Sequence, residues 1–63
     1  MKVLSALGAY GRYPSREDWD AGKDFRAYQG AYFSIRDVKM LKEMWYTRID
    51  FKHGGHVVFS VEL

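Results

Sequence analysis

The chain has no cysteine, one proline and no apolar run long enough to cross a membrane. The absence of cysteine excludes disulfides, cysteine-based zinc sites and thiol chemistry, and favours a cytoplasmic location. The net charge is also small: ten basic and eight acidic residues give a formal charge of +2, too mild to indicate a nucleic-acid-binding protein by itself. The first residues lack the long apolar segment and cleavage site of a signal peptide, so we interpret them as mature sequence.

Aromatic residues, in contrast, are abundant. They make up 17% of the 63 residues and include five tyrosines and two tryptophans. A chain of this length forms one domain, near the lower limit at which a protein folds without disulfides or metals, and its core is too small to bury every ring. Exposed Tyr and Trp side chains are typical of interfaces, so composition indicates a binding function.

The N-terminal part predicts a strand followed by a short helix. Residues 3–10 are apolar and fit either a strand or a short helix, but the N-terminal position, the two glycines at 8 and 11 and the strand-rich remainder of the chain favour a strand. Ser15, followed by acidic residues, is a typical N-cap. We therefore expect a short helix over residues 16–21, which Gly22 can end.

Residues 25–33 alternate between apolar and polar or aromatic side chains, as in a half-buried strand. The face opposite the apolar one carries Arg26, Tyr28 and Tyr32. Rings and arginines on an open strand suit either a protein partner or the bases and phosphates of single-stranded nucleic acid. A structural alternative is that the two tyrosines pack beneath the loop of residues 11–24 as a second small core.

The main helix has the clearest start. Ser34 is the predicted N-cap, Asp37 completes a capping box, and Val38 is placed to form a hydrophobic staple with the residue before the cap. At the helical period, Val38, Leu41 and Trp45 lie on one apolar stripe, whereas the opposite side is mostly basic. We expect Leu41 and Trp45 in the core.

The C-terminal residues predict a hairpin around two adjacent glycines. A two-residue turn would place the apolar residues of the two strands on opposite faces of the sheet. A three-residue loop over residues 53–55 instead pairs Phe51 with Val57 and Ile49 with Phe59, which keeps them on one face. We therefore predict the three-residue loop.

Together these elements predict an α+β fold in the order β-(short α)-β-α-β-β. The expected architecture is a small antiparallel sheet of three to four strands with one main α-helix packed on one face. Because so short a sheet leaves its edges open and the chain is 48% hydrophobic, we also expect a homodimer, formed through an edge strand or the uncovered sheet face.

Asp50, His53 and His56 lie close together in the sequence and could suggest a metal or acid–base site. However, strand geometry points Asp50 and His53 to opposite faces, and no second carboxylate or cysteine completes a ligand set. A small nuclease could use such histidines, but no nucleophile stands at a recognisable spacing. We expect exposed turn histidines, no metal, no cofactor and no catalytic residue.

The passage from the 25–33 strand into the main helix, with Gly30, Ser34, Asp37 and Leu41 at fixed spacing, resembles small phage-encoded inhibitor proteins. The uracil-DNA-glycosylase inhibitor of Bacillus phages has a similar passage, and some small anti-CRISPR proteins have a ββαββ layout. The resemblance covers roughly residues 25–51 and implies a stoichiometric inhibitor. This chain differs from a DNA mimic because its exposed helix face carries lysines rather than carboxylates.

The resulting hypothesis is a non-enzymatic protein that occupies a protein partner, such as a host or defence complex, and has no membrane association. The alternative is a nucleic-acid-binding module that uses the aromatic strand face. Trp19 suits either a core lid or an exposed anchor, because it lies in a short acidic helix. The predicted partner-binding residues are Arg26, Tyr28, Tyr32, Tyr13 and Trp19.

Overall fold

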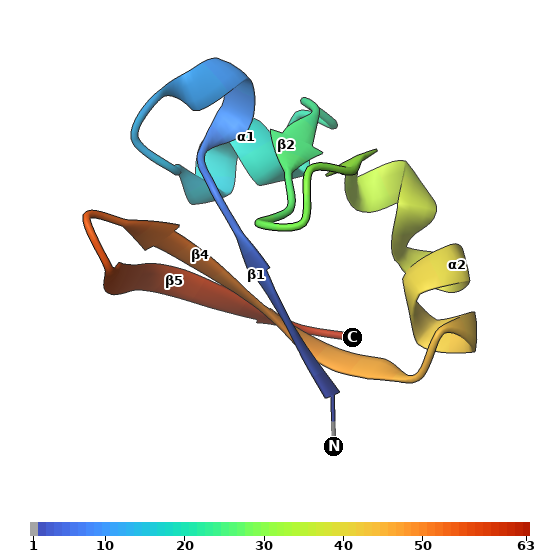
Figure 1. The fold of residues 1–63 in the computed structure, drawn as a ribbon. Helices are drawn as coiled ribbons and strands as arrows, with labels where there is room; N and C mark the ends of the chain where they lie inside the picture. Colours follow the sequence, from blue (N-terminus) through green and yellow to red (C-terminus); the bar gives the residue numbers. More distant parts are fainter. Residues whose placement is uncertain (1) are drawn as a thin grey trace.

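The computed structural model describes residues 2–63 and contains a three-stranded sheet with the strand order β1-β4-β5 (Figure 1). Its strands are β1 (Lys2–Ala6), β4 (Tyr46–His53) and β5 (His56–Glu62). β5 is antiparallel to β4, but β1 is parallel to it, so the sheet is mixed and the prediction of a wholly antiparallel sheet is wrong. Parallel pairing is possible here because the long connection between β1 and β4 can cross over the sheet.

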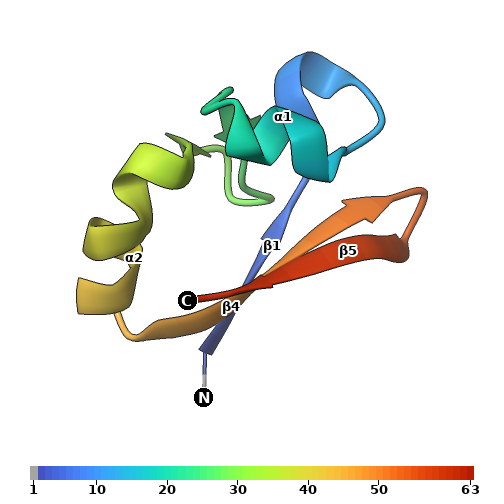
Figure 2. The same ribbon diagram turned by 180° about the vertical axis from the view of Figure 1, so that it is seen from behind.

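The remaining elements are short. They are η1 (Ala9–Gly11), α1 (Arg16–Asp20), β2 (Phe25–Arg26), β3 (Tyr32–Phe33), η2 (Ile35–Asp37) and α2 (Val38–Glu43). Figures 1 and 2 show α1 and α2 on the same side of the three-stranded sheet. The fold is therefore a mixture of α and β structure, mostly sheet, with one main helix over residues 35–43. No helix within residues 2–63 is both long and apolar enough to cross a bilayer.

The predicted short helix is confirmed, whereas the strand predicted over residues 3–10 is confirmed only in its first half. β1 ends at Ala6, and the following residues form a loop and η1. The Ser15 hydroxyl accepts a hydrogen bond from the backbone N–H of Glu17 (3.2 Å), as expected of an N-cap. After α1 the backbone turns at Gly22, whose φ of 77° is readily adopted by glycine.

The predicted single strand over residues 25–33 is instead a small hairpin. β2 and β3 pair antiparallel, with Phe25 opposite Phe33 and Arg26 opposite Tyr32, and a turn at Gly30 (φ 106°) joins them. The alternation of side chains in this segment is symmetric about its midpoint. When the segment folds back on itself, the residues predicted to be apolar still share one face, and Arg26, Tyr28 and Tyr32 still share the other. The faces are therefore as predicted, although the segment forms a hairpin rather than one strand.

This hairpin also covers the free edge of β1. Ala6 and Ala27 form an antiparallel bridge, the Leu7 N–H donates to the Arg26 carbonyl (2.8 Å), and the Tyr28 N–H donates to the Ser5 carbonyl (3.0 Å). The C-terminal end of β1 is thus paired on both sides, although β1 is an edge strand of the three-stranded sheet. β5 forms the other edge, where unpaired backbone groups are available to another chain.

The predicted start of the main helix is confirmed. Ser34 and Asp37 form a capping box, in which the Ser34 N–H donates to the Asp37 carboxylate (2.8 Å). Leu41 is 4% exposed, as predicted, but Trp45 is 81% exposed, so its assignment to the core is wrong. The physical reason is that α2 ends at Glu43 and Trp45 adopts a left-handed backbone conformation (φ 72°), which removes it from the apolar stripe.

The C-terminal hairpin has a two-residue turn, so the predicted three-residue loop is wrong. His53 pairs with His56, and Gly54 and Gly55 both have positive φ, as a type I′ turn requires. Val58 then bulges out of the ladder, and beyond it Phe51 pairs with Phe59. The bulge restores the apolar residues to one face, which was the reason for predicting the longer loop.

The core lies between the sheet and the helical layer and is centred on aromatic rings. Trp19 is 1% exposed, and its ring centroid lies 5.4 Å from that of Phe51 and 5.8 Å from that of Phe25. The other buried apolar residues are Leu4, Ala6, Ala9, Ala27, Phe33, Leu41, Ile49 and Val61. None of the fully buried residues is a tyrosine, although the half-buried Tyr46 packs against them.

Candidate binding surface

Four of the five predicted binding residues lie on the surface. Tyr13, Tyr28 and Tyr32 are 61%, 53% and 67% exposed, and Arg26 is also exposed. The alternative in which Tyr28 and Tyr32 form a second small core is therefore wrong. Trp19 is the exception: because it is buried at the centre of the core, it is unavailable to a partner and its assignment to the binding surface is wrong.

Tyr10 is a further exposed aromatic residue that the sequence analysis missed. It is 62% exposed and sits in η1 with a positive φ of 53°, an unusual conformation for a bulky residue. Sequence reasoning placed it at the end of an apolar strand. The available signal was its position between Gly8 and Gly11, because closely spaced glycines favour a tight loop over a strand.

The exposed tyrosines gather on one surface because three separate segments meet. The Tyr13 ring lies 4.8 Å, centroid to centroid, from the ring of His53 at the tip of the β4–β5 hairpin. The Lys52 ammonium lies 5.8 Å from the centre of the Tyr28 ring. We call this area the tyrosine surface; its members are Tyr10, Arg12, Tyr13, Arg26, Tyr28, Tyr32, Lys52 and His53.

Tyr28 occupies the sheet face opposite the core. Ala27 and Ala6 are buried, and side chains alternate along a strand, so Tyr28 must point to the other side. Lys52 follows the buried Phe51 and lies on that same side for the same reason. The contact between Lys52 and Tyr28 thus spans the open face of the sheet, with β1 between them.

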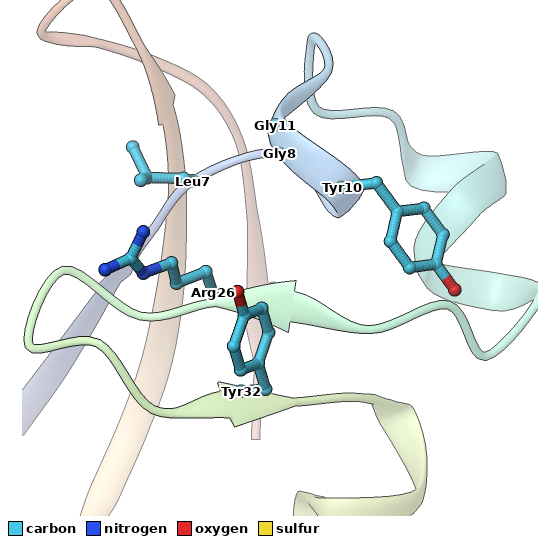
Figure 3. Close-up of a pocket in the computed structure, with 6 residues that line it drawn as sticks. All are labelled: Leu7, Gly8, Tyr10, Gly11, Arg26 and Tyr32. Carbon is cyan, nitrogen blue, oxygen red and sulfur yellow. The ribbon is translucent and has the colours of Figure 1, made fainter.

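A groove of about 290 Å³ opens where η1 meets the β2–β3 hairpin (Figure 3). It is lined by Leu7, Gly8, Tyr10, Gly11, Arg26 and Tyr32. In Figure 3 the Tyr32 ring stands against β2, Tyr10 projects from η1, and the Arg26 side chain extends the opposite way, toward Leu7. Rings, a guanidinium group and bare backbone therefore border one opening.

Gly8 shapes this opening through a close backbone approach. A Cβ atom at Gly8 would lie 1.6 Å from the carbonyl oxygen of Arg12 and 2.9 Å from the nitrogen of Pro14. Only glycine fits without moving the backbone, so the loop that presents Tyr10 depends on the absence of a side chain at this position.

No family model, curated protein or solved structure matches the chain. The resemblance to phage inhibitors stays a prediction.

Charge is divided unevenly over the molecule. The segments that build the tyrosine surface, residues 8–13, 26–32 and 52–56, contain no Asp or Glu. Acidic residues of α1 and the loop after it are paired with basic side chains instead: Asp18 with Lys23 (3.1 Å), Asp20 with Arg16 (3.5 Å), and Asp24 with Arg36 (3.6 Å). The tyrosine surface is consequently basic, although the whole chain is nearly neutral.

The candidate metal residues do not converge. The Asp50 carboxylate accepts hydrogen bonds from the Ser60 hydroxyl (2.7 Å) and from two nitrogens of Arg48 (2.9 and 3.3 Å), while His53 contacts Tyr13. The hydrogen bond from Ser60, together with Arg48, lowers the pKa of Asp50 despite its burial. Within residues 2–63 no cluster of His, Asp or Glu side chains is arranged to hold a metal ion.

Proposed function

We propose that this protein is a non-enzymatic binding protein that uses the tyrosine surface to occupy a partner protein and inhibit it stoichiometrically. The observation that carries the proposal is that four tyrosines are more than half exposed on one surface, although the core is complete without them. Folding does not explain their position. Exposed rings of this kind are the residues that protein interfaces use as anchors.

The chemistry of the surface supports binding to a protein. Tyrosine buries a large area on docking and loses little side-chain entropy, because only two side-chain torsions must be fixed. Arg26 adds a planar group with five donors, which can pair with carboxylates or backbone carbonyls of a partner. The partner we propose, as the resemblance to phage inhibitors suggests, is a host or defence complex.

The test compares two tyrosine variants with a matched control. After a partner is isolated from a host lysate, its affinity is measured by calorimetry for the parent protein and for Tyr28→Ala, Tyr32→Ala and Lys39→Ala. Lys39 is exposed on α2, away from the tyrosine surface. Each tyrosine variant should weaken binding by at least about 1–2 kcal/mol, the usual scale of a hot spot. Lys39→Ala should change it by no more than about 0.5 kcal/mol.

Thermal unfolding of the same variants provides the control for folding, since both tyrosines are exposed and their removal should leave the cooperative transition intact. Equal affinities for the parent and both tyrosine variants would remove this surface as the binding site. A loss of affinity in Lys39→Ala alone would move the interface to the helical side of the molecule.

A further inference from the structure

The tyrosine surface combines exposed rings with cations that form no ion pair, although Lys52 lies close enough to Asp50 to help lower the pKa of that carboxyl group. Arg12, Arg26 and Lys52 have no Asp or Glu within ion-pairing distance (4.0 Å) in the described structure. Two histidines, His53 and His56, lie beside these cations at the hairpin tip. A local excess of positive charge attracts phosphate even when the net charge of a protein is small, because the nearest charges dominate the field in salt.

The rings are spaced among these cations rather than apart from them. Lys52 lies over the face of Tyr28, and His53 lies beside Tyr13. Arg26 and Tyr32 are directly paired across the β2–β3 hairpin. Single-strand binding proteins use this combination: their aromatic rings stack on bases, and neighbouring cations contact the phosphates of the nucleic acid.

The groove between η1 and the β2–β3 hairpin adds a place for one flat group. Its rim carries the Tyr10 and Tyr32 rings, and Gly8 and Gly11 leave part of its lining as bare backbone (Figure 3). A planar ring can approach such a lining closely, because no side chain stands in the way. Arg26 lies at the same opening, directed toward Leu7, where a phosphate next to the bound ring would meet it (Figure 3).

Tyr10 gives an independent indication that the groove has a use. Its left-handed conformation is costly for a bulky residue, yet its ring is 62% exposed and contributes little to the core. Strain of this kind is concentrated at ligand-binding sites.

We propose that the tyrosine surface binds single-stranded nucleic acid, with one base held in the groove between Tyr10 and Tyr32 and the adjacent phosphate on Arg26. A single strand fits better than a duplex, because stacking on exposed rings requires bases that are not already stacked. This proposal concerns a different partner from the protein proposed above, and each proposal is tested separately.

The test is fluorescence anisotropy with a labelled oligothymidylate of roughly 12 nucleotides, a length within the range of known single-strand sites. Saturable binding is expected at low salt. If three cations contact phosphates, raising the salt from about 50 to about 200 mM should weaken binding roughly 20-fold. A duplex of the same length should bind more weakly than the single strand.

Matched variants separate this site from general attraction between opposite charges. Arg26→Gln and Lys39→Gln each remove one positive charge, the first at the groove and the second on α2. Arg26→Gln and Tyr32→Ala should each weaken binding by about fivefold or more, the lower range for loss of a base-stacking ring. Lys39→Gln should leave affinity within about twofold of the parent, as expected of a distant charge screened by salt.

Three results would overturn the proposal: no saturable binding at low salt, duplex bound as tightly as single strand, or equal effects of Arg26→Gln and Lys39→Gln. If the oligonucleotide fails to bind while Tyr28→Ala still weakens a protein partner, the surface is a protein interface only. If the oligonucleotide binds and no tyrosine variant affects a protein partner, the nucleic-acid proposal stands and the protein proposal fails.

Discussion

Replacing Trp45 by alanine and, separately, by glycine tests the least expected feature of the fold. Trp45 follows the C-cap of α2, and its N–H donates to the Lys42 carbonyl (3.0 Å), a backbone bond that any residue except proline can make. Its ring is 81% exposed, so only about a fifth of a side chain of roughly 200 Å² is covered. At about 25 cal/mol per Å², Trp45→Ala should cost no more than about 1 kcal/mol.

The glycine variant isolates the backbone contribution, since both substitutions remove the ring. A left-handed residue other than glycine costs roughly 1–2 kcal/mol. Trp45→Gly should therefore be more stable than Trp45→Ala by about 1 kcal/mol or more, the reverse of the usual preference for alanine over glycine within a helix or strand. Relative to the parent, Trp45→Gly should be neutral or up to about 1 kcal/mol more stable.

Urea unfolding followed by circular dichroism measures both differences. Trp19→Ala is the reference for a buried ring and should cost about 3–5 kcal/mol, enough to unfold a domain of this size. The reasoning fails if the glycine variant at position 45 is less stable than the alanine variant. It also fails if Trp45→Ala costs as much as Trp19→Ala.

Four further predictions concern stability and assembly. Gly8→Ala should destabilise the fold by more than about 2 kcal/mol in urea unfolding, because its Cβ would overlap a backbone carbonyl and overpacking of this kind costs typically 1–3 kcal/mol or more. Leu41→Ala should cost about 2–5 kcal/mol and Ser34→Ala about 1 kcal/mol in the same assay; equal losses would contradict the assignment of one to the core and the other to the cap. Folding lowers the pKa of Asp50, so the charged carboxylate stabilises the fold above about pH 4, the ordinary pKa, and this stabilisation is lost as the pH falls through the pKa of the folded state. The difference in melting temperature between the parent and Asp50→Asn should therefore shrink in acid. A difference that stays constant with pH would refute the argument. A homodimer through the open edge of β5 should appear in light scattering at high micromolar concentration, and a mass of 7.4 kDa throughout would exclude it.

Local signals in the sequence located the beginnings of elements better than their ends. The start of the main helix was predictable because Ser34 and Asp37 satisfy the first N–H groups through contacts within one turn. Its end was not, because the left-handed position at Trp45 is normally marked by glycine or asparagine, and tryptophan gives no such signal. The apolar period continued past the true end and placed Trp45 in the core.

The faces of strands were predictable even where their pairing was not. In the β4–β5 hairpin, Phe51 and its partner share the apolar face, as predicted. The sequence did not show that a bulge at Val58, rather than a longer loop, would produce this register. Likewise, the exposed face of Arg26, Tyr28 and Tyr32 was predicted from alternation alone. The meeting of these residues with Tyr10 and the hairpin tip depends on how distant segments fold together, which no local pattern reveals.

The position of β1 has a consequence for how copies of the chain interact during folding. β1 comes from the start of the described chain and is an edge strand of the three-stranded sheet; β4 pairs with it on one side, and residues 26–28 bond to its C-terminal end on the other. The β2–β3 and β4–β5 hairpins each pair residues that are close in sequence, whereas β1 pairs with residues distant from it. β1 can therefore add to the sheet after both hairpins have formed. If β1 detaches from β4 and from residues 26–28, the β1 strand of a second molecule could take its place and make the same hydrogen bonds. The glycine-containing loop after β1 would then be the hinge of a strand-exchanged dimer, and the population of that dimer would grow with protein concentration.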